Sequence, residues 1–239
     1  MVSATEKHGM MVSARDIKGV IFDIDGVLLD SLRIWMDLGA RYLVSIGLQP
    51  EQGLGDILFS MSMEQGAEYL KDHYPIDKSA EDILKVLSGM LRDFYYYEVG
   101  IKPGAENLLR SLRDAGICIT AATSSPREYV EKALDRNGLH GYISCIFTNS
   151  EIGKSKHFPD IFNAAAAHMK TSSEETMVIE DSLYAVKTAA AAGYHTIGIA
   201  DPNGEPDQEG LRRAADLYIS ELCEAQQFFD SGRQDNETI

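Results

Sequence analysis

The sequence contains little cysteine, with only Cys118, Cys145 and Cys223 among its 239 residues. Their odd number argues against a disulfide framework, and their spacing does not match that of a metal-binding cysteine cluster. A chain of this length can bury a core that needs no covalent staples. We therefore expect a protein of a reducing compartment, the cytoplasm.

Positive charge is scarce as well. The 22 Lys and Arg residues face 37 Asp and Glu residues, which gives a formal net charge of −15 and a pI near 4.7. Binding to nucleic acid depends on clustered Lys and Arg side chains that neutralise phosphates. We expect no nucleic-acid partner.

Long hydrophobic runs are missing. Residues 1–16 do not have a basic start followed by an apolar stretch of about seven residues, and no later segment approaches the roughly 20 residues that span a bilayer. We expect no membrane association, a monomer, and a loosely ordered N-terminal extension over residues 1–16.

Short apolar runs alternate with helical patterns over much of the chain. The expected strands cover residues 19–22, 117–121, 144–147, 177–179 and 196–199, with a short sixth at 216–219. Expected helices at 104–114, 127–137 and 160–169 each have a proline near the start. This alternation predicts an α/β fold with a Rossmann-like parallel sheet core.

Residues 31–98 have a different pattern, since apolar residues recur there at helical spacing without any strand signal. We predict an all-helical cap over 31–98, inserted into an α/β catalytic core of residues 17–30 and 99–239. Because the insertion follows the first strand, we expect the cap to cover the carboxyl edge of the sheet, with Gly26, Asp30, Gly100 and Pro103 as hinges.

Two carboxylates, Asp23 and Asp25, directly follow the first expected strand. In an open α/β sheet ligands bind outside the carboxyl ends of the strands, and alternation along the chain lets both side chains point to one site. One carboxylate can then attack a phosphoryl group while the other transfers protons. The simpler alternative is a turn in which both side chains are solvated or cap backbone amides.

Hydroxyl groups follow the second strand. Thr123 can donate its hydroxyl to a phosphoryl oxygen, and the N–H of Ser124 lies near a helix N-terminus, which favours anions. We expect Ser125 to be the N-cap of the helix that Pro126 opens. The alternative is that these residues only cap that helix.

A lysine follows the third strand. We expect Lys156, in the loop before Pro159 and Asp160, to neutralise negative charge on the transferring group, and Lys154 to be a solvated surface charge.

The fourth strand ends in Glu180 and Asp181, a second acidic pair at the same edge. The repulsion with Asp23 is relieved if Mg²⁺ takes oxygens from Asp23, the backbone carbonyl of Asp25, and Asp181. Glu180 is either a further ligand or orients a metal-bound water. The alternative for Asp181 is that it only caps the helix beginning at Ser182.

In this order along the chain, these four segments resemble the haloacid-dehalogenase (HAD) superfamily, in its β-phosphoglucomutase-like and phosphatase branch with a helical cap after the first strand. The resemblance covers about residues 17 to 229. It rests on Asp-x-Asp-Gly at 23–26, Thr123, Lys156 ahead of Pro-Asp, and Glu180-Asp181.

The resemblance implies catalysis through an aspartyl-phosphate. Asp23 would be the nucleophile and Asp25 the acid and base, with Mg²⁺, Thr123 and Lys156 holding the phosphoryl oxygens. The phosphate would contact Asp23, Ile24, Asp25, Thr123, Ser124 and Lys156, and the metal would be bound by Asp23, Asp25, Glu180 and Asp181. Because dehalogenases of the family lack the second Asp, Asp25 favours a phosphatase or a mutase.

We therefore expect a Mg²⁺-dependent phosphatase acting on a small phosphorylated metabolite, with sugar phosphates among the candidates. A β-phosphoglucomutase-type mutase is the rival, and a protein that binds phosphometabolites without turnover is a third alternative. Residues 42–70 contain no Lys or Arg to hold a second phosphate, which weakens the mutase hypothesis. Leu58, Met61 and Met63 in that stretch suit an apolar leaving group, or else form helical core.

One position departs from the family pattern. His157 follows Lys156 where relatives commonly have proline. The imidazole lies either near the site or, as a more ordinary outcome, on the surface.

Overall fold

The structure is a computed structural model, and it describes residues 13–59 and 61–234. The chain forms two compact units. The α/β unit contains the described residues up to Asp30 and those from Gly100 onward, and the helical unit is Ser31–Val99. Most of the predicted N-terminal extension, residues 1–12, lies outside the described residues.

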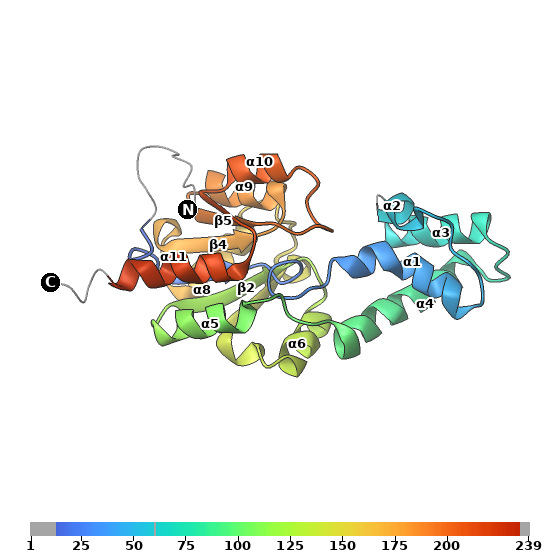
Figure 1. Ribbon diagram of the computed structural model, residues 1–239, viewed down its shortest axis with the longest axis horizontal. Coiled ribbons are helices and arrows are strands. Elements are labelled where there is room, and N and C mark those ends of the chain that lie inside the picture. Colours follow the sequence, from blue (N-terminus) through green and yellow to red (C-terminus); the bar gives the residue numbers. More distant parts are fainter. Residues whose placement is uncertain (1–12, 60, 235–239) are drawn as a thin grey trace. The chain divides into compact units, whose positions relative to one another are not determined.

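A six-stranded sheet forms the centre of the α/β unit (Figure 1). Its strand order is β3-β2-β1-β4-β5-β6, and all the pairings are parallel. The predicted fold class is confirmed, and the short sixth strand is present. The strands are β1 (Gly19–Phe22), β2 (Cys118–Thr123), β3 (Cys145–Thr148), β4 (Thr176–Glu180), β5 (His195–Ile199) and β6 (Leu217–Ile219).

Strand β1 lies in the middle of the sheet and is buried along its whole length. Its last residue, Phe22, is aligned with Ala121 of β2 and with Ile179 of β4. The N–H of Asp23 donates to the carbonyl of Ile179 at 2.9 Å. This register brings the residues that follow β1, β2 and β4 to one edge of the sheet, as expected for parallel strands.

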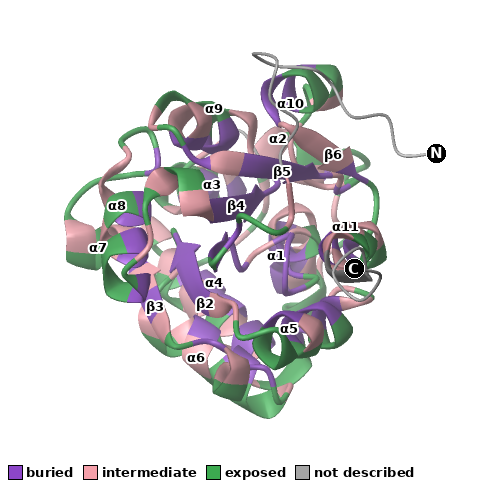
Figure 2. Cartoon of the chain, turned by 90° about the vertical axis from the view of Figure 1, so that its left-hand side faces the viewer, coloured by how far each residue is buried: buried purple, intermediate pink, exposed green. Residues whose placement is uncertain are grey.

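Helices surround the sheet, with buried residues in the strands and exposed residues on the outer faces of the helices (Figure 2). The helices predicted at 104–114, 127–137 and 160–169 are present, with bounds shifted by at most one residue at either end. The helices are α5 (Ala105–Asp114), α6 (Arg127–Arg136), α7 (Asn149–Ile152), α8 (Asp160–Met169), α9 (Leu183–Ala191), α10 (Gln208–Ala214) and α11 (Leu222–Gln234), with short 3₁₀ turns at His140–Tyr142 and Ser173–Glu175.

Alanines let two of these helices approach the sheet closely. Ala165 of α8 and Ala185 and Ala189 of α9 are fully buried in one core with Ile21 and Val178. Small side chains on a helix permit such contact without leaving cavities. Helices α8 and α9 are therefore firmly packed against the strands whose ends carry Asp23 and Glu180.

The helical unit contains α1 (Arg33–Ser45), α2 (Leu54–Phe59), α3 (Met63–His73), α4 (Ala80–Asp93) and a π-helix, η1 (Phe94–Glu98). Apart from residue 60, which the structure does not describe, this unit has no strand. Ser62 caps α3 in a capping box with Gln65, and Ser79 caps α4. Such caps satisfy backbone donors that the first helical turn leaves unpaired.

Across the two described stretches, none of the helices is both long enough and apolar enough to pass through a membrane.

Candidate active site

Asp23 is the first residue after β1, and its side chain is buried, with only 7% of the residue exposed. The chain reverses directly behind it, because Gly26 adopts a positive φ of 78° and its N–H donates to the carbonyl of Leu29 at 2.9 Å. Ile24 is fully buried, so only its backbone atoms can contact a phosphate. Asp25, two residues on, is half-buried.

Lys156 reaches Asp23 from the loop between α7 and α8. Its ammonium donates to Oδ1 of Asp23 and, at 2.5 Å, to Oε1 of Glu180, and the residue is 2% exposed. Burial lowers the pKa of Lys156, but the charges of Asp23 and Glu180 raise it, and the net direction is upward. Lys156 therefore stays protonated. Lys154 is exposed and pairs with Asp160 at 2.6 Å, as predicted for a surface charge.

A buried acidic cluster surrounds this ammonium. Oxygens of Asp23, Glu180 and Asp181 all lie within 4.8 Å of one another. Burial, with smaller contributions from Glu180 and Asp25, raises the pKa of Asp23 to about 8 even though Lys156 opposes it. Burial and then the Glu180 charge raise the pKa of Asp181 well above its usual range.

This donor set fits a metal ion. One lysine does not balance three buried carboxylates, so a bound cation would relieve both the repulsion and the cost of burial. Carboxylate oxygens are the ligands that hard divalent cations prefer. The cluster can thus hold such a cation.

The two acidic residues after β4 differ in their hydrogen bonds. Oε2 of Glu180 accepts the N–H of Asp181 at 3.0 Å and that of Ser182 at 3.1 Å, while its Oε1 accepts from Lys156. Oδ1 of Asp181 accepts the hydroxyl of Ser182 at 3.1 Å. Glu180 is thus engaged at both oxygens, which suits an orienting role better than direct coordination.

The alternative in which Asp181 only caps α9 does not match the contacts at the helix start. No side-chain cap is made at the N-cap residue, Ser182. The N–H of Leu183 donates instead to Oε2 of Glu205 at 3.0 Å. Glu205, from the loop after β5, therefore makes the helix cap that this alternative assigned to Asp181.

Ser125 joins Asp25 to the hydroxyl-bearing segment after β2. Its hydroxyl donates to Oδ2 of Asp25 at 2.7 Å, and its N–H donates to Oγ1 of Thr123 at 3.0 Å. The prediction that Ser125 is the N-cap of α6 is wrong, since Pro126 holds that position without a side-chain cap. The hydroxyl donates to the Asp25 carboxylate, a strong charged acceptor, and this orients the side chain toward Asp25.

The structure thus brings the predicted residues to one edge of the sheet, in different ways. Asp23, Lys156, Glu180 and Asp181 are in one cluster, and Thr123 and Asp25 are connected through Ser125. The Ser124 hydroxyl accepts from the side-chain amide of Asn149, at 2.7 Å.

The sequence prediction missed three of these contacts: the hydrogen bond from Ser125 to Asp25, that from Asn149 to Ser124, and the capping of α9 by Glu205. Each joins residues at least 22 positions apart, so no local pattern signals it.

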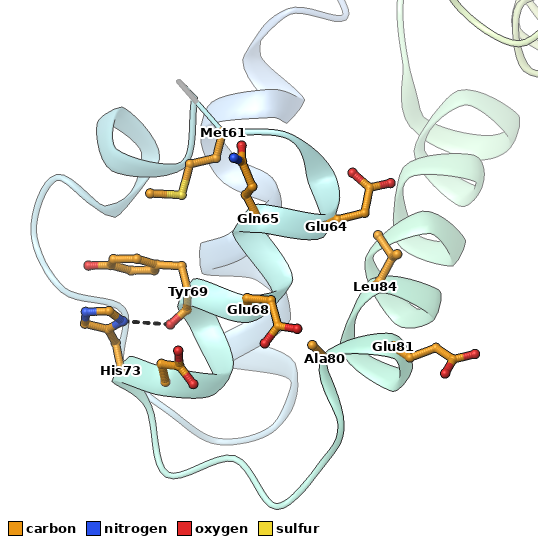
Figure 3. Close-up of a pocket in the computed structure, with 10 residues that line it drawn as sticks. Met61, Glu64, Gln65, Glu68, Tyr69, His73, Ala80, Glu81 and Leu84 are labelled. Atoms are coloured by element: carbon orange, nitrogen blue, oxygen red, sulfur yellow. Dashed lines mark hydrogen bonds between the residues drawn. The ribbon is translucent and has the colours of Figure 1, made fainter.

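Two hollows lie within the described part of the helical unit. The larger, about 750 Å³, lies between α3 and α4 (Figure 3) and has no Lys or Arg in its lining. Its charged residues include Glu64, Glu68, Asp72 and Glu81, which repel a phosphate anion. The smaller hollow, about 280 Å³, is mainly apolar, and Leu58, Met61 and Met63 are among the residues that line it. These three residues therefore border a hollow and are not packed entirely within the core of the unit.

Comparisons with known proteins point to one family. Residues 20–199 match the family described as "Haloacid dehalogenase-like hydrolase". The chain is 28% identical over 217 residues to the bifunctional riboflavin kinase/FMN phosphatase of Arabidopsis thaliana, covering 87% of this chain and 52% of that protein, so it spans about half of that relative's length.

Two further similarities cover most of both proteins. The chain is 24% identical over 181 residues to the phosphorylated carbohydrates phosphatase of Thermotoga maritima, which covers 76% of this chain and 84% of that one. A crystal structure of a HAD family hydrolase from Deinococcus radiodurans R1, with bound phosphate and sodium, has a TM-score of 0.75 and 26% identity, covering 91% of this chain and 96% of that one.

Proposed function

Because this chain belongs to the haloacid dehalogenase-like hydrolase family, we propose that it is a Mg²⁺-dependent phosphatase that acts on a small phosphorylated metabolite. The observation that carries the proposal is the contact of the Lys156 ammonium with Asp23 inside the buried acidic cluster. Phosphoryl transfer needs a nucleophile and concentrated positive charge, and this arrangement can supply both.

In the proposed reaction a carboxylate oxygen of Asp23 attacks phosphorus. The bond from phosphorus to the leaving oxygen breaks, and Asp25 gives that oxygen its proton. Asp25 then takes a proton from water, whose oxygen attacks the phosphorus of the aspartyl-phosphate, so that phosphate leaves and Asp23 is regenerated. The hydroxyl of Ser125, 2.7 Å from Asp25, would hold that side chain for both proton transfers.

The remaining phosphoryl oxygens would be held by donors at the same edge. We assign this role to the ammonium of Lys156, the hydroxyl of Thr123, the N–H of Ser124 and backbone atoms of Ile24. Lys156 is buried, so its charge acts with little screening by water.

We assign the metal to Asp23, Asp181 and the backbone carbonyl of Asp25. Glu180 would orient the groups around the metal through the hydrogen bonds that both of its carboxylate oxygens accept. When bound, Mg²⁺ would neutralise charge on the transferring phosphoryl group. Asp23 and Asp181 must lose their protons before they can bind the metal. Because the pKa values of both side chains are raised, metal binding would depend on pH.

The names of the relatives support a small-metabolite substrate. One is a bifunctional riboflavin kinase/FMN phosphatase and another a phosphatase of phosphorylated carbohydrates. A mutase of the β-phosphoglucomutase type remains the rival. The absence of Lys and Arg from residues 42–70 argues against it, because a mutase must hold a second phosphate.

The test is release of inorganic phosphate from phenyl phosphate, with Mg²⁺ and with EDTA. We expect release with Mg²⁺ only. A subsequent screen of sugar phosphates, with analysis of the products, distinguishes released phosphate from an isomerised sugar phosphate and so separates a phosphatase from a mutase. Binding of phosphate esters without any turnover would favour the third alternative, a binding protein.

A further inference from the structure

Two aromatic side chains flank the catalytic candidates of the α/β unit. His157 directly follows Lys156, and Tyr184 is the second residue of α9, three positions after Asp181. Their rings stack, with centroids 4.3 Å apart and an angle of 28° between the planes. Both residues are exposed, and Tyr184 retains 37% of its surface.

The Tyr184 ring lies next to the segment that carries Lys156, because it stacks on His157, the residue that directly follows that lysine. Burial raises the pKa of the Tyr184 hydroxyl, the charge of Glu180 raises it further, and the charge of Lys156 opposes the shift.

The imidazole of His157 thus supports one face of the Tyr184 ring. An aromatic side chain that is only part of a core would be buried, whereas this one keeps more than a third of its surface exposed. A rigid, exposed ring loses little conformational entropy when a ligand packs against it. Planar groups stack on such rings with an offset, gaining affinity beyond that from burial alone.

We propose that Tyr184, supported by His157, is a specificity-determining residue whose ring packs against a planar leaving group of the phosphate monoester. This inference rests on the proposed phosphatase function and narrows its substrate class. Aryl or heteroaromatic phosphate esters are then preferred to saturated esters of the same size.

The test uses phenyl phosphate and cyclohexyl phosphate, which differ in the planarity of the ring but little in size. We expect Tyr184→Ala to lower kcat/KM for phenyl phosphate by about three- to tenfold more than for cyclohexyl phosphate. Comparing each variant with wild type on the same substrate cancels the different intrinsic reactivities of the two esters. Inhibition constants of phenylphosphonate and cyclohexylphosphonate give the same comparison without a chemical step.

Tyr184→Phe keeps the ring and is expected to keep the preference for phenyl phosphate. Phe158→Ala is the matched control, because Phe158 is an exposed ring in the same loop, 54% exposed, that takes no part in the stack. It should leave the ratio of the two substrates unchanged. His157→Ala should weaken the preference in part.

An equal effect of Tyr184→Ala on both substrates and both inhibitors would overturn this inference and leave the phosphatase proposal standing. The inference is also overturned if Phe158→Ala changes the ratio of the two substrates as much as Tyr184→Ala does. If the wild-type protein releases no phosphate from either ester with Mg²⁺, both proposals fail together.

Discussion

The ammonium of Lys156 contacts the carboxylate of Asp23, although 133 positions separate the two residues in the sequence. One comes from the loop after β3 and α7, the other from the end of β1. The same ammonium also donates to Glu180, the last residue of β4. The Nζ atom of Lys156 therefore joins the ends of β1 and β4 to the loop that follows α7. The contact makes Lys156 both part of the proposed phosphate site and a positive charge that offsets part of the negative charge of a buried acidic cluster.

Replacing Lys156 with Met should abolish most of the turnover. The change removes the buried positive charge that we propose stabilises the transferring phosphoryl group, and losses of about 10²- to 10³-fold in kcat are typical for such donors. Lys154→Met is the matched control, since that lysine is exposed and forms its ion pair with Asp160 at the surface. Steady-state phosphate release measures both. Equal rates for the two variants would contradict the role of Lys156.

Ser125→Ala tests the hydrogen bond that holds Asp25. We expect a moderate loss of kcat, about threefold to tenfold, because one hydrogen bond to a carboxylate contributes about 1 kcal/mol or somewhat more. Since Asp25 is proposed as the acid and base, the pH–rate profile should shift as well. An unchanged profile with reduced protein stability would indicate that the hydroxyl serves folding alone.

The raised pKa of Asp23 predicts how stability depends on pH in metal-free protein. Between about pH 4 and 8 the folded protein keeps a proton on Asp23 that the unfolded chain releases, so this residue makes stability fall as pH rises. Asp23→Asn removes this effect. In EDTA, the stability of the variant relative to wild type should therefore increase from pH 5 to pH 8 and level off above.

Urea unfolding at a series of pH values measures this difference. Asp72→Asn, at an exposed carboxylate of the helical unit, is the control and should show no comparable trend. A difference between Asp23→Asn and wild type that does not change with pH would contradict the raised pKa.

An ion pair between the partly buried Lys102 and the buried Asp201 ties the segment that re-enters the α/β unit to the loop after β5. Lys102 donates to Oδ2 of Asp201 at 2.6 Å, and the two side chains are only 14% and 1% exposed. Lys102→Met leaves Asp201 buried without this cation and should cost about 3 kcal/mol of unfolding free energy. The double variant with Asp201→Asn should recover much of the loss, which urea unfolding of the single and double variants will measure. Additive losses would contradict the coupling.

Much of this site follows from local sequence patterns. Buried apolar runs locate the strands, parallel pairing brings their ends together, and Asp23, Thr123, Lys156 and Asp181 stand at the ends of strands or in the loops behind them. The family resemblance drawn from these segments is confirmed by the match over residues 20–199.

The remaining contacts could not be predicted, because they join side chains whose meeting depends on the folded backbone. Ser125 is an example. Its position before Pro126 predicts a helix cap, yet Pro126 is the N-cap residue, and the turn after β1 brings Asp25 within reach of the Ser125 hydroxyl, which donates to it. The stack of His157 on Tyr184 and the pair of Lys102 with Asp201 likewise have no local signal.

The most direct test of the central claim is to detect the phosphoryl group on Asp23. Wild-type protein is mixed with phenyl phosphate and Mg²⁺, quenched rapidly in acid, digested, and examined by mass spectrometry. We predict a phosphoryl adduct on the peptide that contains Asp23, absent with EDTA and absent in Asp23→Asn, which should also lose turnover while remaining folded. An adduct on another residue, or phosphate release by Asp23→Asn at the wild-type rate, would contradict the account.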